Sequence, residues 1–294
     1  MPSTTPPTGE PFGYTAGDGL AVAAFRWVPD GAPRAVVQLT HGMGEHISRY
    51  EHLAARLRDA GFLVAGQDHR GHGATADPAV LGVIGAAGWG ELVNDVHLLT
   101  RHLRAEHPGL PLVLLGHSMG SFAAQQHLLD HSDEIDALVL TGTAVLDLLE
   151  PALDLDQPLD LSAFNAPFAP ARTDYDWLSR DESQVDAYVA DPFCGFGLDA
   201  AAGKAMFIGA RRVADPAALA AVRDSLPVYI AAGDQDPVGG ALALVHPLVE
   251  RLRAAGLTDV TVTAYPGARH EVFNETNRDE VESDLMTWLN RVVP

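Results

Sequence analysis

Cysteine and lysine are nearly absent from this sequence of 294 residues, and each occurs once. Because Cys194 is the single cysteine, no disulfide can form within the chain, and a cysteine-rich zinc site is excluded. Basic residues are also scarce, with 19 Lys and Arg against 39 Asp and Glu, which gives a formal net charge of −20. Nucleic-acid phosphates require clustered basic side chains, so we expect no nucleic-acid partner. The same acidity disfavours docking on an anionic membrane.

Long apolar runs are missing as well. The apolar run at 112–115 is far too short to span a bilayer. The N-terminal segment MPSTTPPTGEPF has neither the basic start nor the apolar stretch of a secretory signal. We therefore expect a cytoplasmic protein without stable membrane insertion. Hydrophobic residues make up 47% of the chain, enough for a sizeable core, and this composition argues against disorder.

Short apolar segments alternate with segments of helical spacing over most of the chain. We expect strands near 20–28, 35–39, 62–68, 110–116, 137–142, 227–233 and 259–265. The segments with helical spacing are 50–60, 89–107, 119–131, 241–255 and 278–292. This alternation predicts an α/β fold, with a mostly parallel sheet covered by helices on both faces.

The alternation is interrupted between about 143 and 225, in a stretch rich in Asp and Pro. Short helices are expected there near 181–190 and 199–212, and a further one starts at Asp215-Pro216, an N-cap followed by proline. We therefore predict one α/β core formed by residues 11–144 and 223–294. Residues 145–222 are predicted to be a helical insertion that acts as a cap, and residues 1–10 a flexible tail.

A candidate nucleophile is Ser118, in the motif Gly-His-Ser-Met-Gly at 116–120. The motif follows an apolar strand directly and opens a predicted helix, which is the setting of a nucleophile elbow. Small residues two positions before and after the serine let the strand and the helix approach closely. Such a serine lies at the carboxyl end of the sheet, where open α/β folds place their sites. The alternative is a glycine-rich turn with a buried serine, and the context favours the nucleophile.

A serine nucleophile needs a base, and the base needs an acid that orients it. In this fold the three follow in the order serine, acid, histidine. His270 comes after the last predicted strand and is the candidate base; a surface loop histidine is the alternative. Asp234 and Asp236 both follow the strand at 227–233. Pro237 restricts Asp236 to an extended conformation, whereas Asp234 suits a turn, so spacing favours Asp236 only slightly.

Backbone amides near the serine would have to stabilise the oxyanion that forms during acyl transfer. The N–H of Met119, directly after the serine, is one expected donor. The other is expected from the loop after the strand at 35–39, where glycines on both sides of Met43 permit a tight bend. An ordinary glycine turn is the alternative. Glu45 and Arg49 stand four residues apart and either brace this loop as an ion pair or are two solvated charges.

Several motifs together resemble those of monoglyceride lipases and bacterial lysophospholipases, a branch of the α/β-hydrolase superfamily. They are HGMGEH at 41–46 with Arg49-Tyr50, DHRGHG at 68–73, GHSMGS at 116–121, GDQD at 233–236 and YPGARHE at 265–271. The resemblance spans most of the chain outside the insertion, which takes the place of the family's cap. It implies a catalytic triad of Ser118, Asp236 and His270. It also implies that the backbone amides of Met43 and Met119 form the oxyanion hole.

Other motifs mimic cofactor and metal sites. The segment 71–76 is similar to a dinucleotide-binding loop, but Asp77-Pro78 interrupts the helix that such a loop must open. Four histidines near glycine turns could suggest a metal: His41, His46, His69 and His72. No helical HExxH pattern supports a metal, and we expect these rings to bond to backbone. We therefore expect neither cofactor nor metal, and Cys194 to be a packed residue rather than a nucleophile.

The sequence predicts a serine hydrolase that cleaves carboxylic esters through an acyl-enzyme. The resemblance implies monoacylglycerol or lysophospholipid esters, so the expected partner is a small-molecule ester with one acyl chain. Aromatic residues of the insertion either line a channel for that chain or simply pack the cap onto the core: Phe164, Phe168, Tyr175, Trp177, Tyr188, Phe193, Phe196 and Phe207.

Two other functions remain open. A serine aminopeptidase of the same superfamily would need carboxylates to hold a substrate ammonium, and Asp174, Asp176 and Glu182 are available. The elbow of such enzymes usually has Trp after the serine, whereas this chain has Met119. A hydrolase-fold ligand receptor is the other alternative, and a complete Ser/Asp/His set disfavours it.

Overall fold

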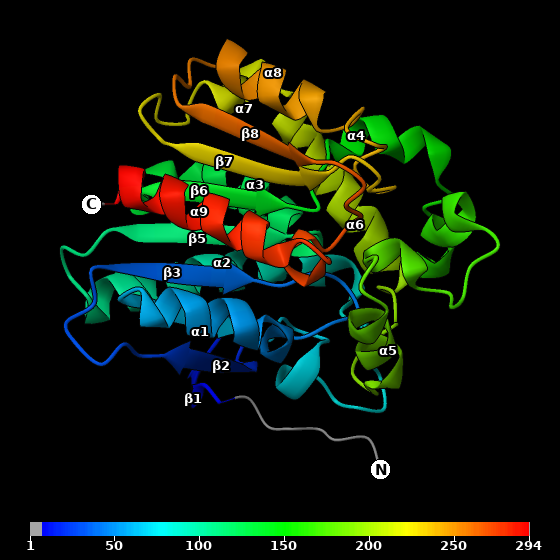
Figure 1. The fold of residues 1–294 in the computed structure, drawn as a ribbon, viewed down its shortest axis with the longest axis horizontal. Helices are drawn as coiled ribbons and strands as arrows, with labels where there is room; N and C mark the ends of the chain where they lie inside the picture. The colour runs from blue at the N-terminus through cyan, green and yellow to red at the C-terminus, as the bar shows by residue number, and fades with distance from the viewer. Residues whose placement is uncertain (1–7, 294) are drawn as a thin grey trace.

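Eight strands form one sheet in the order β1-β2-β4-β3-β5-β6-β7-β8, in a computed structural model that describes residues 8–293 (Figure 1). The strands are β1 Glu10–Thr15, β2 Ala21–Trp27, β3 Ala35–Thr40, β4 Phe62–Gln67, β5 Leu112–His117, β6 Ala137–Thr141, β7 Val228–Gly233 and β8 Val260–Tyr265. β1 and β2 pair antiparallel, as do β2 and β4. All other neighbours pair in parallel, which confirms the predicted fold class.

Helices cover both faces of the sheet. α1 (Glu51–Asp59) and α9 (Arg278–Val292) lie on one face (Figure 1). The other face is covered by α2 (Gly85–Glu106), α3 (Met119–His131) and α8 (His246–Ala254). Successive residues of a strand divide between the two cores: in β5, Leu114 packs towards α2 and α3, and Leu115 packs towards α1 and α9. The central strands therefore read as continuous apolar runs.

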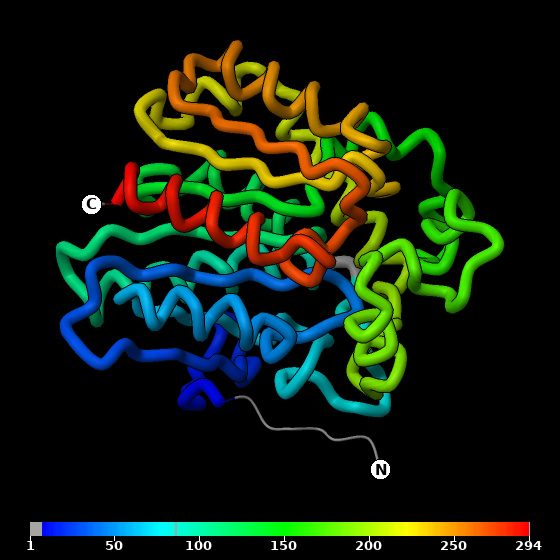
Figure 2. The backbone as a smooth tube through the Cα atoms, in the orientation of Figure 1, coloured from blue at the N-terminus to red at the C-terminus, as the bar shows by residue number. Residues whose placement is uncertain are grey.

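Residues 145–222, the predicted insertion, lie at the carboxyl ends of the parallel strands (Figures 1 and 2). Its helices are α4 Leu146–Leu149, α5 Glu182–Ala190, α6 Ala200–Ala210 and α7 Pro216–Leu219. Short 3-10 turns link them: η4 Glu150–Ala152, η5 Leu161–Phe168, η6 Asp176–Leu178 and η7 Arg211–Ala214. α6 packs against α2 and α3, so the insertion shares one core with a face of the sheet. The remaining short turns are η1 Ile47–Tyr50, η2 Gly73–Thr75, η3 Ser132–Glu134 and η8 Val272–Asn274.

The structure differs from the sequence expectations at several boundaries. Residues 1–7 of the predicted tail lie outside the described residues, and Glu10 already begins β1, which forms a hairpin with β2. α8 begins at His246 rather than at 241, because Ala241 and Leu242 have φ values of 50° and 77°, outside the helical region. No helix within residues 8–293 combines the length and the apolar composition that a bilayer crossing requires.

Candidate active site

Ser118 occupies a strained turn between β5 and α3. Its φ of 50° and ψ of −122° lie outside the regions that side chains favour. Its N–H donates to Thr141 O at 2.9 Å, which ties the turn to the neighbouring strand. A Cβ on Gly116 would lie 2.6 Å from Gly120 O, and one on Gly120 would collide with the backbone of Thr40. The two flanking glycines are therefore a steric requirement of this turn.

His270 and Asp236 meet at the carboxyl ends of β7 and β8. His270 Nδ1 and Asp236 Oδ1 are 2.9 Å apart, and each side chain is only 2% exposed. The same carboxylate oxygen accepts the N–H of Val238 at 2.9 Å. Asp234 instead accepts the N–H of Gly267 at 2.7 Å and so closes the loop before His270. Of the two candidate acids, the structure therefore pairs Asp236 with His270.

The surroundings of His270 favour proton transfer. Burial opposes the charged imidazolium, but the Asp236 carboxylate outweighs it and raises the pKa of His270 above 6.5. The ring lies between Trp177 and His117, with centroid separations of 4.9 and 4.8 Å. Burial, together with the nearby His270, lowers the pKa of His117 to about 4. His117 is thus neutral near pH 7, whereas the Asp236 carboxylate favours the protonated form of His270.

Ser118 follows β5 and His270 follows β8, so both come from the carboxyl edge of the sheet, with β6 and β7 between them. A Cβ on Gly142 would lie 2.7 Å from His270 Cε1, so this edge has no room for a larger residue beside the ring. Among the hydrogen bonds within residues 8–293, none joins the Ser118 hydroxyl to His270. Such contacts are often loose without substrate and tighten in the reacting complex.

The loop after β3 packs directly against the serine. A Cβ on Gly42 would lie 3.1 Å from Ser118 Cβ. Gly44 has a φ of 63°, which turns the chain sharply after Met43. Glu45 stabilises this turn, because its Oε1 accepts hydrogen bonds from the Gly42 N–H at 2.5 Å and from the Tyr50 hydroxyl at 2.8 Å.

Arg49 links this loop to the loop that bears His270. Its guanidinium donates to Glu45 Oε2 at 2.6 Å and to both oxygens of Glu271 at 2.5 and 2.7 Å. Despite burial, Arg49 lowers the pKa of Glu271 to about 2, so the pair is ionised. Of the two interpretations left open for Glu45 and Arg49, the structure has the ion pair. Glu271 was missed because it stands 222 residues away from Arg49 and no local pattern points to it.

The insertion also holds the His270 loop through its backbone. The N–H of Glu271 donates to Leu178 O at 2.8 Å, and the N–H of His270 donates to Trp177 O at 3.4 Å. Arg180 Nε donates to Glu275 Oε2 at 2.8 Å, and that carboxylate is fully buried. Residues 177–180 therefore position the histidine as well as cover it.

An apolar cavity of about 380 Å³ opens above Ser118. Met43 and Met119 lie beside the serine in its wall, and the insertion supplies most of the rest: Leu146, Leu149, Leu153, Leu159, Leu161, Phe164, Trp177, Met206 and Phe207. Three of the insertion's aromatic residues thus line the cavity. Others pack elsewhere: Tyr188, for example, lies under the Arg49 guanidinium at 4.7 Å. Asp154, Gln157 and Asp160 are the other polar residues of the lining, and all three are exposed.

The structure also shows the surroundings of the candidate metal-site histidines, of the loop that mimics a dinucleotide motif, and of Cys194. His41 Nδ1 and His72 Nδ1 contact the carbonyls of Gly42 and Arg70, as expected for turn histidines. The loop that mimics a dinucleotide motif leads only into the short turn η2. Two of these histidines differ from the expectation. The His46 ring contacts a carboxylate rather than backbone, and neither ring nitrogen of His69 has a hydrogen-bond partner among the described residues. Burial raises the pKa of the half-buried Cys194 thiol, which disfavours the thiolate that a nucleophile needs.

Similarity to known proteins agrees with this geometry. The model of the family described as "Serine aminopeptidase, S33" matches residues 31–277. A monoacylglycerol lipase of Mycolicibacterium smegmatis is 35% identical over 282 residues, covering 92% of this chain and 93% of that protein. The human monoglyceride lipase is 30% identical, with 93% and 88% covered.

A solved structure of a thermostable carboxyl esterase from Bacillus coagulans, in complex with glycerol, superposes with a TM-score of 0.85 at 31% identity. It covers 97% of this chain and 99% of the esterase. The resemblance drawn from the motifs is thereby confirmed over nearly the whole length. The chain belongs to the serine aminopeptidase S33 family of α/β-hydrolases, in the branch that includes the monoglyceride lipases.

Proposed function

We propose that this protein hydrolyses monoacylglycerols, with Ser118 as nucleophile, His270 as general base and acid, and Asp236 as the orienting acid. The observation that carries the proposal is the buried Asp236–His270 pair at the sheet edge where Ser118 forms the floor of an apolar cavity. The lipase and esterase relatives bear out the predicted carboxylic ester hydrolase. The roles of the individual residues rest on the geometry described above.

The chemistry proceeds in two acyl transfers. Ser118 Oγ attacks the ester carbonyl while His270 Nε2 takes the hydroxyl proton, and the amides of Met43 and Met119 stabilise the oxyanion. Collapse of the tetrahedral intermediate breaks the bond to glycerol, which leaves with the proton from His270. Water then attacks the acyl-enzyme with His270 as base, and the fatty acid is released. Asp236 stabilises the imidazolium in both steps, consistent with the raised pKa of His270.

The cavity suits one acyl chain. Its volume lies at the lower end of the range of about 300–1,000 Å³ typical of small-molecule sites. Beyond the serine, most of its walls are leucine, methionine and aromatic side chains, and its polar residues Asp154, Gln157 and Asp160 are exposed. The insertion, residues 145–222, is accordingly proposed to be the cap that selects the chain and excludes water.

Activity towards a panel of substrates tests this function. Wild-type protein is expected to release fatty acid from monoacylglycerols and p-nitrophenyl esters and to leave aminoacyl anilides intact. The aminopeptidase alternative invoked Asp174, Asp176 and Glu182, and none of these lines the cavity. Turnover of aminoacyl anilides above that of esters would favour the peptidase, and absence of turnover on every substrate would favour a ligand receptor.

Acyl-chain selection by the insertion gives a first prediction. Leu149→Ala and Leu153→Ala remove side chains that line the cavity. Each is expected to lower kcat/KM for dodecanoyl esters by about 1–3 kcal/mol more than for acetyl esters, because only the long chain reaches the lost surface. Leu148→Ala is the matched control, since Leu148 precedes Leu149 in α4 but is 49% exposed and outside the lining. An equal loss at every chain length would show that these residues only stabilise the fold.

The charge around the cavity predicts a preference for neutral head groups. Among the lining residues within 8–293, none is Lys, Arg or His, and the exposed Asp154 and Asp160 lie in the wall. An anionic phosphate would meet two carboxylates on a protein of net charge −20. We therefore expect 1-lauroylglycerol to be cleaved with a kcat/KM about tenfold or more above that for lauroyl lysophosphatidylglycerol at low salt.

Ionic strength and a double variant distinguish this effect of charge from an effect of head-group size. Exposed charges are screened, so the ratio between the two lipids is expected to narrow at high ionic strength. The double variant Asp154→Asn/Asp160→Asn should narrow it likewise at low salt, while the rate with 1-lauroylglycerol changes little. A ratio insensitive to both salt and variant would assign the discrimination to head-group size.

A further inference from the structure

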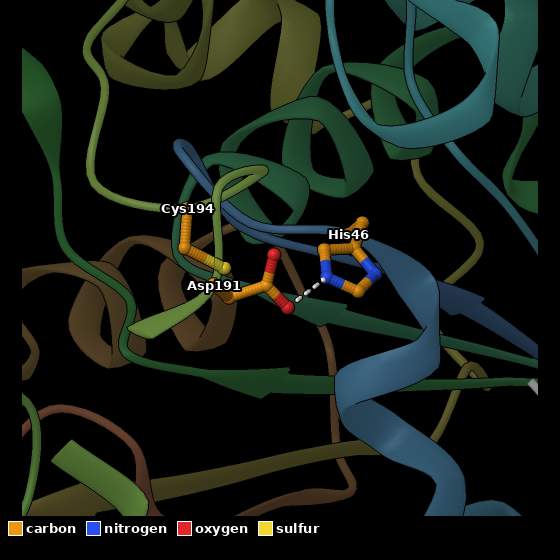
Figure 3. A group of neighbouring side chains, drawn as sticks. All are labelled: His46, Asp191 and Cys194. Atoms are coloured by element: carbon orange, nitrogen blue, oxygen red, sulfur yellow. Dashed lines mark hydrogen bonds and ion pairs between the residues drawn. The ribbon is translucent and has the colours of Figure 1, made fainter. Parts of the chain in front are cut away.

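We propose that His46, Asp191 and Cys194 form a binding site for a zinc ion, separate from the catalytic centre. His46 lies between β3 and η1, Asp191 directly follows α5, and Cys194 follows in the next turn. Figure 3 shows the three side chains converging, with the imidazole and the thiol on either side of the carboxylate. The imidazole nitrogen, the carboxylate oxygen and the sulfur all lie within 4.8 Å of one another.

The spacing is close to that of a coordinated ion. Bonds of about 2.0–2.3 Å from zinc to nitrogen, oxygen and sulfur place tetrahedral ligands roughly 3.3–3.8 Å apart. His46 Nε2 and Asp191 Oδ2 are 3.0 Å apart, slightly closer than that. Small side-chain rotations would thus admit the ion between them and bring the sulfur into reach.

The three ligand types, and the hydrogen bond that fixes the Asp191 carboxylate, favour zinc among divalent cations. A thiolate with an imidazole selects zinc over Mg²⁺ and Ca²⁺, which prefer oxygen ligands. The second carboxylate oxygen of Asp191 accepts the Phe193 N–H at 2.9 Å, which fixes the carboxylate as an outer-shell contact does in metal sites. The His46 and Asp191 side chains are 16% and 25% exposed, which leaves an entry path and room for water as a fourth ligand. On binding, the thiol loses its proton to solvent as the Zn–S bond forms.

The site joins two parts of the active-site wall. Gly195 N donates to Gly44 O at 3.0 Å, so the turn that holds Cys194 already touches the loop that holds Met43. A bound ion would add covalent-strength links between that loop and the insertion. Zinc is therefore expected to raise the melting temperature, because it binds the folded arrangement and not the separated segments.

Zinc binding to the full-length, metal-free protein tests the proposal without any substrate. Titration against a chromophoric chelator should show one strong site per chain, and Co²⁺ should give a thiolate-to-cobalt charge-transfer band in the near ultraviolet. Because Cys194 is the single thiol, its reaction with Ellman's reagent should slow when zinc is added. These readouts use the wild-type chain, and they do not depend on whether the protein cleaves esters.

Variants locate the ion. Cys194→Ser, His46→Gln and Asp191→Asn should each weaken zinc binding by at least about 100-fold, since loss of a ligand costs more than loss of an outer-shell contact. The control is His131→Gln, which disrupts the other group within residues 8–293 that could hold an ion, His97, His131 and Glu134. Loss of the strong site in His131→Gln, or its retention in Cys194→Ser and Asp191→Asn, would overturn the proposal. So would an unprotected thiol in wild-type protein with zinc.

Discussion

Ser118→Ala is expected to lower kcat for ester hydrolysis by about 10⁴–10⁶ while the protein keeps its fold. The loss is this large because no other nucleophilic side chain takes the serine's place: the nearby Ser121 hydroxyl instead donates to Ser118 O at 2.7 Å. The measurements are kcat with a p-nitrophenyl ester and covalent labelling by a fluorophosphonate.

Ser121→Ala is the matched control for the nucleophile. It removes a hydroxyl one turn along the same helix, and its hydrogen bonds to Ser118 O and Thr143 Oγ1 are structural. We expect this variant to remain labelled and to keep most of its turnover. If the label mapped to another residue, or Ser118→Ala kept wild-type turnover, the proposed mechanism would be wrong.

Asp236→Asn is expected to lower kcat by about 10³–10⁴. The carboxylate holds the His270 ring through Nδ1 at 2.9 Å, and an amide would present a donor or favour the wrong tautomer. It would also remove the charge that raises the pKa of His270. The histidine inflection in the pH profile of kcat/KM should therefore move to lower pH, in addition to the fall in rate.

Asp234→Asn separates the orienting role from loop structure. Asp234 Oδ1 accepts the Gly267 N–H and the Gln235 side-chain amide, and an amide oxygen can accept the same bonds. We expect this variant to lose far less activity than Asp236→Asn. The reverse order would assign the acid to Asp234, against the geometry.

The arrangement of the core was predictable because each signal is local. Apolar runs such as 112–115 are buried on both sides, and the glycines around Ser118 are required by the turn they occupy. β1 escaped prediction because its sequence, EPFGYT, contains Pro and Gly and presents mostly exposed side chains. β1 is extended because its backbone pairs with β2, a contact that its composition does not predict.

Contacts between distant segments were not predictable in the same way. Residue spacing left Asp234 and Asp236 nearly equal, and only the family resemblance implied Asp236. In physical terms the choice depends on where the β8 loop places His270. Glu271 completes the Arg49 network and Trp177 packs on His270, yet neither has a spacing that relates it to its partner. The His46–Asp191 contact likewise joins residues 145 positions apart.

The backbone contacts of residues 177–180 limit how the insertion can be exchanged between relatives. A chimera that replaced the whole of residues 145–222 would also replace the carbonyls that receive the N–H groups of His270 and Glu271. It would remove the Arg180 partner of the buried Glu275 as well. Substrate specificity is better transplanted by grafting 145–172 and 191–215 separately, with the stretch around Trp177 inherited from the same parent as the histidine.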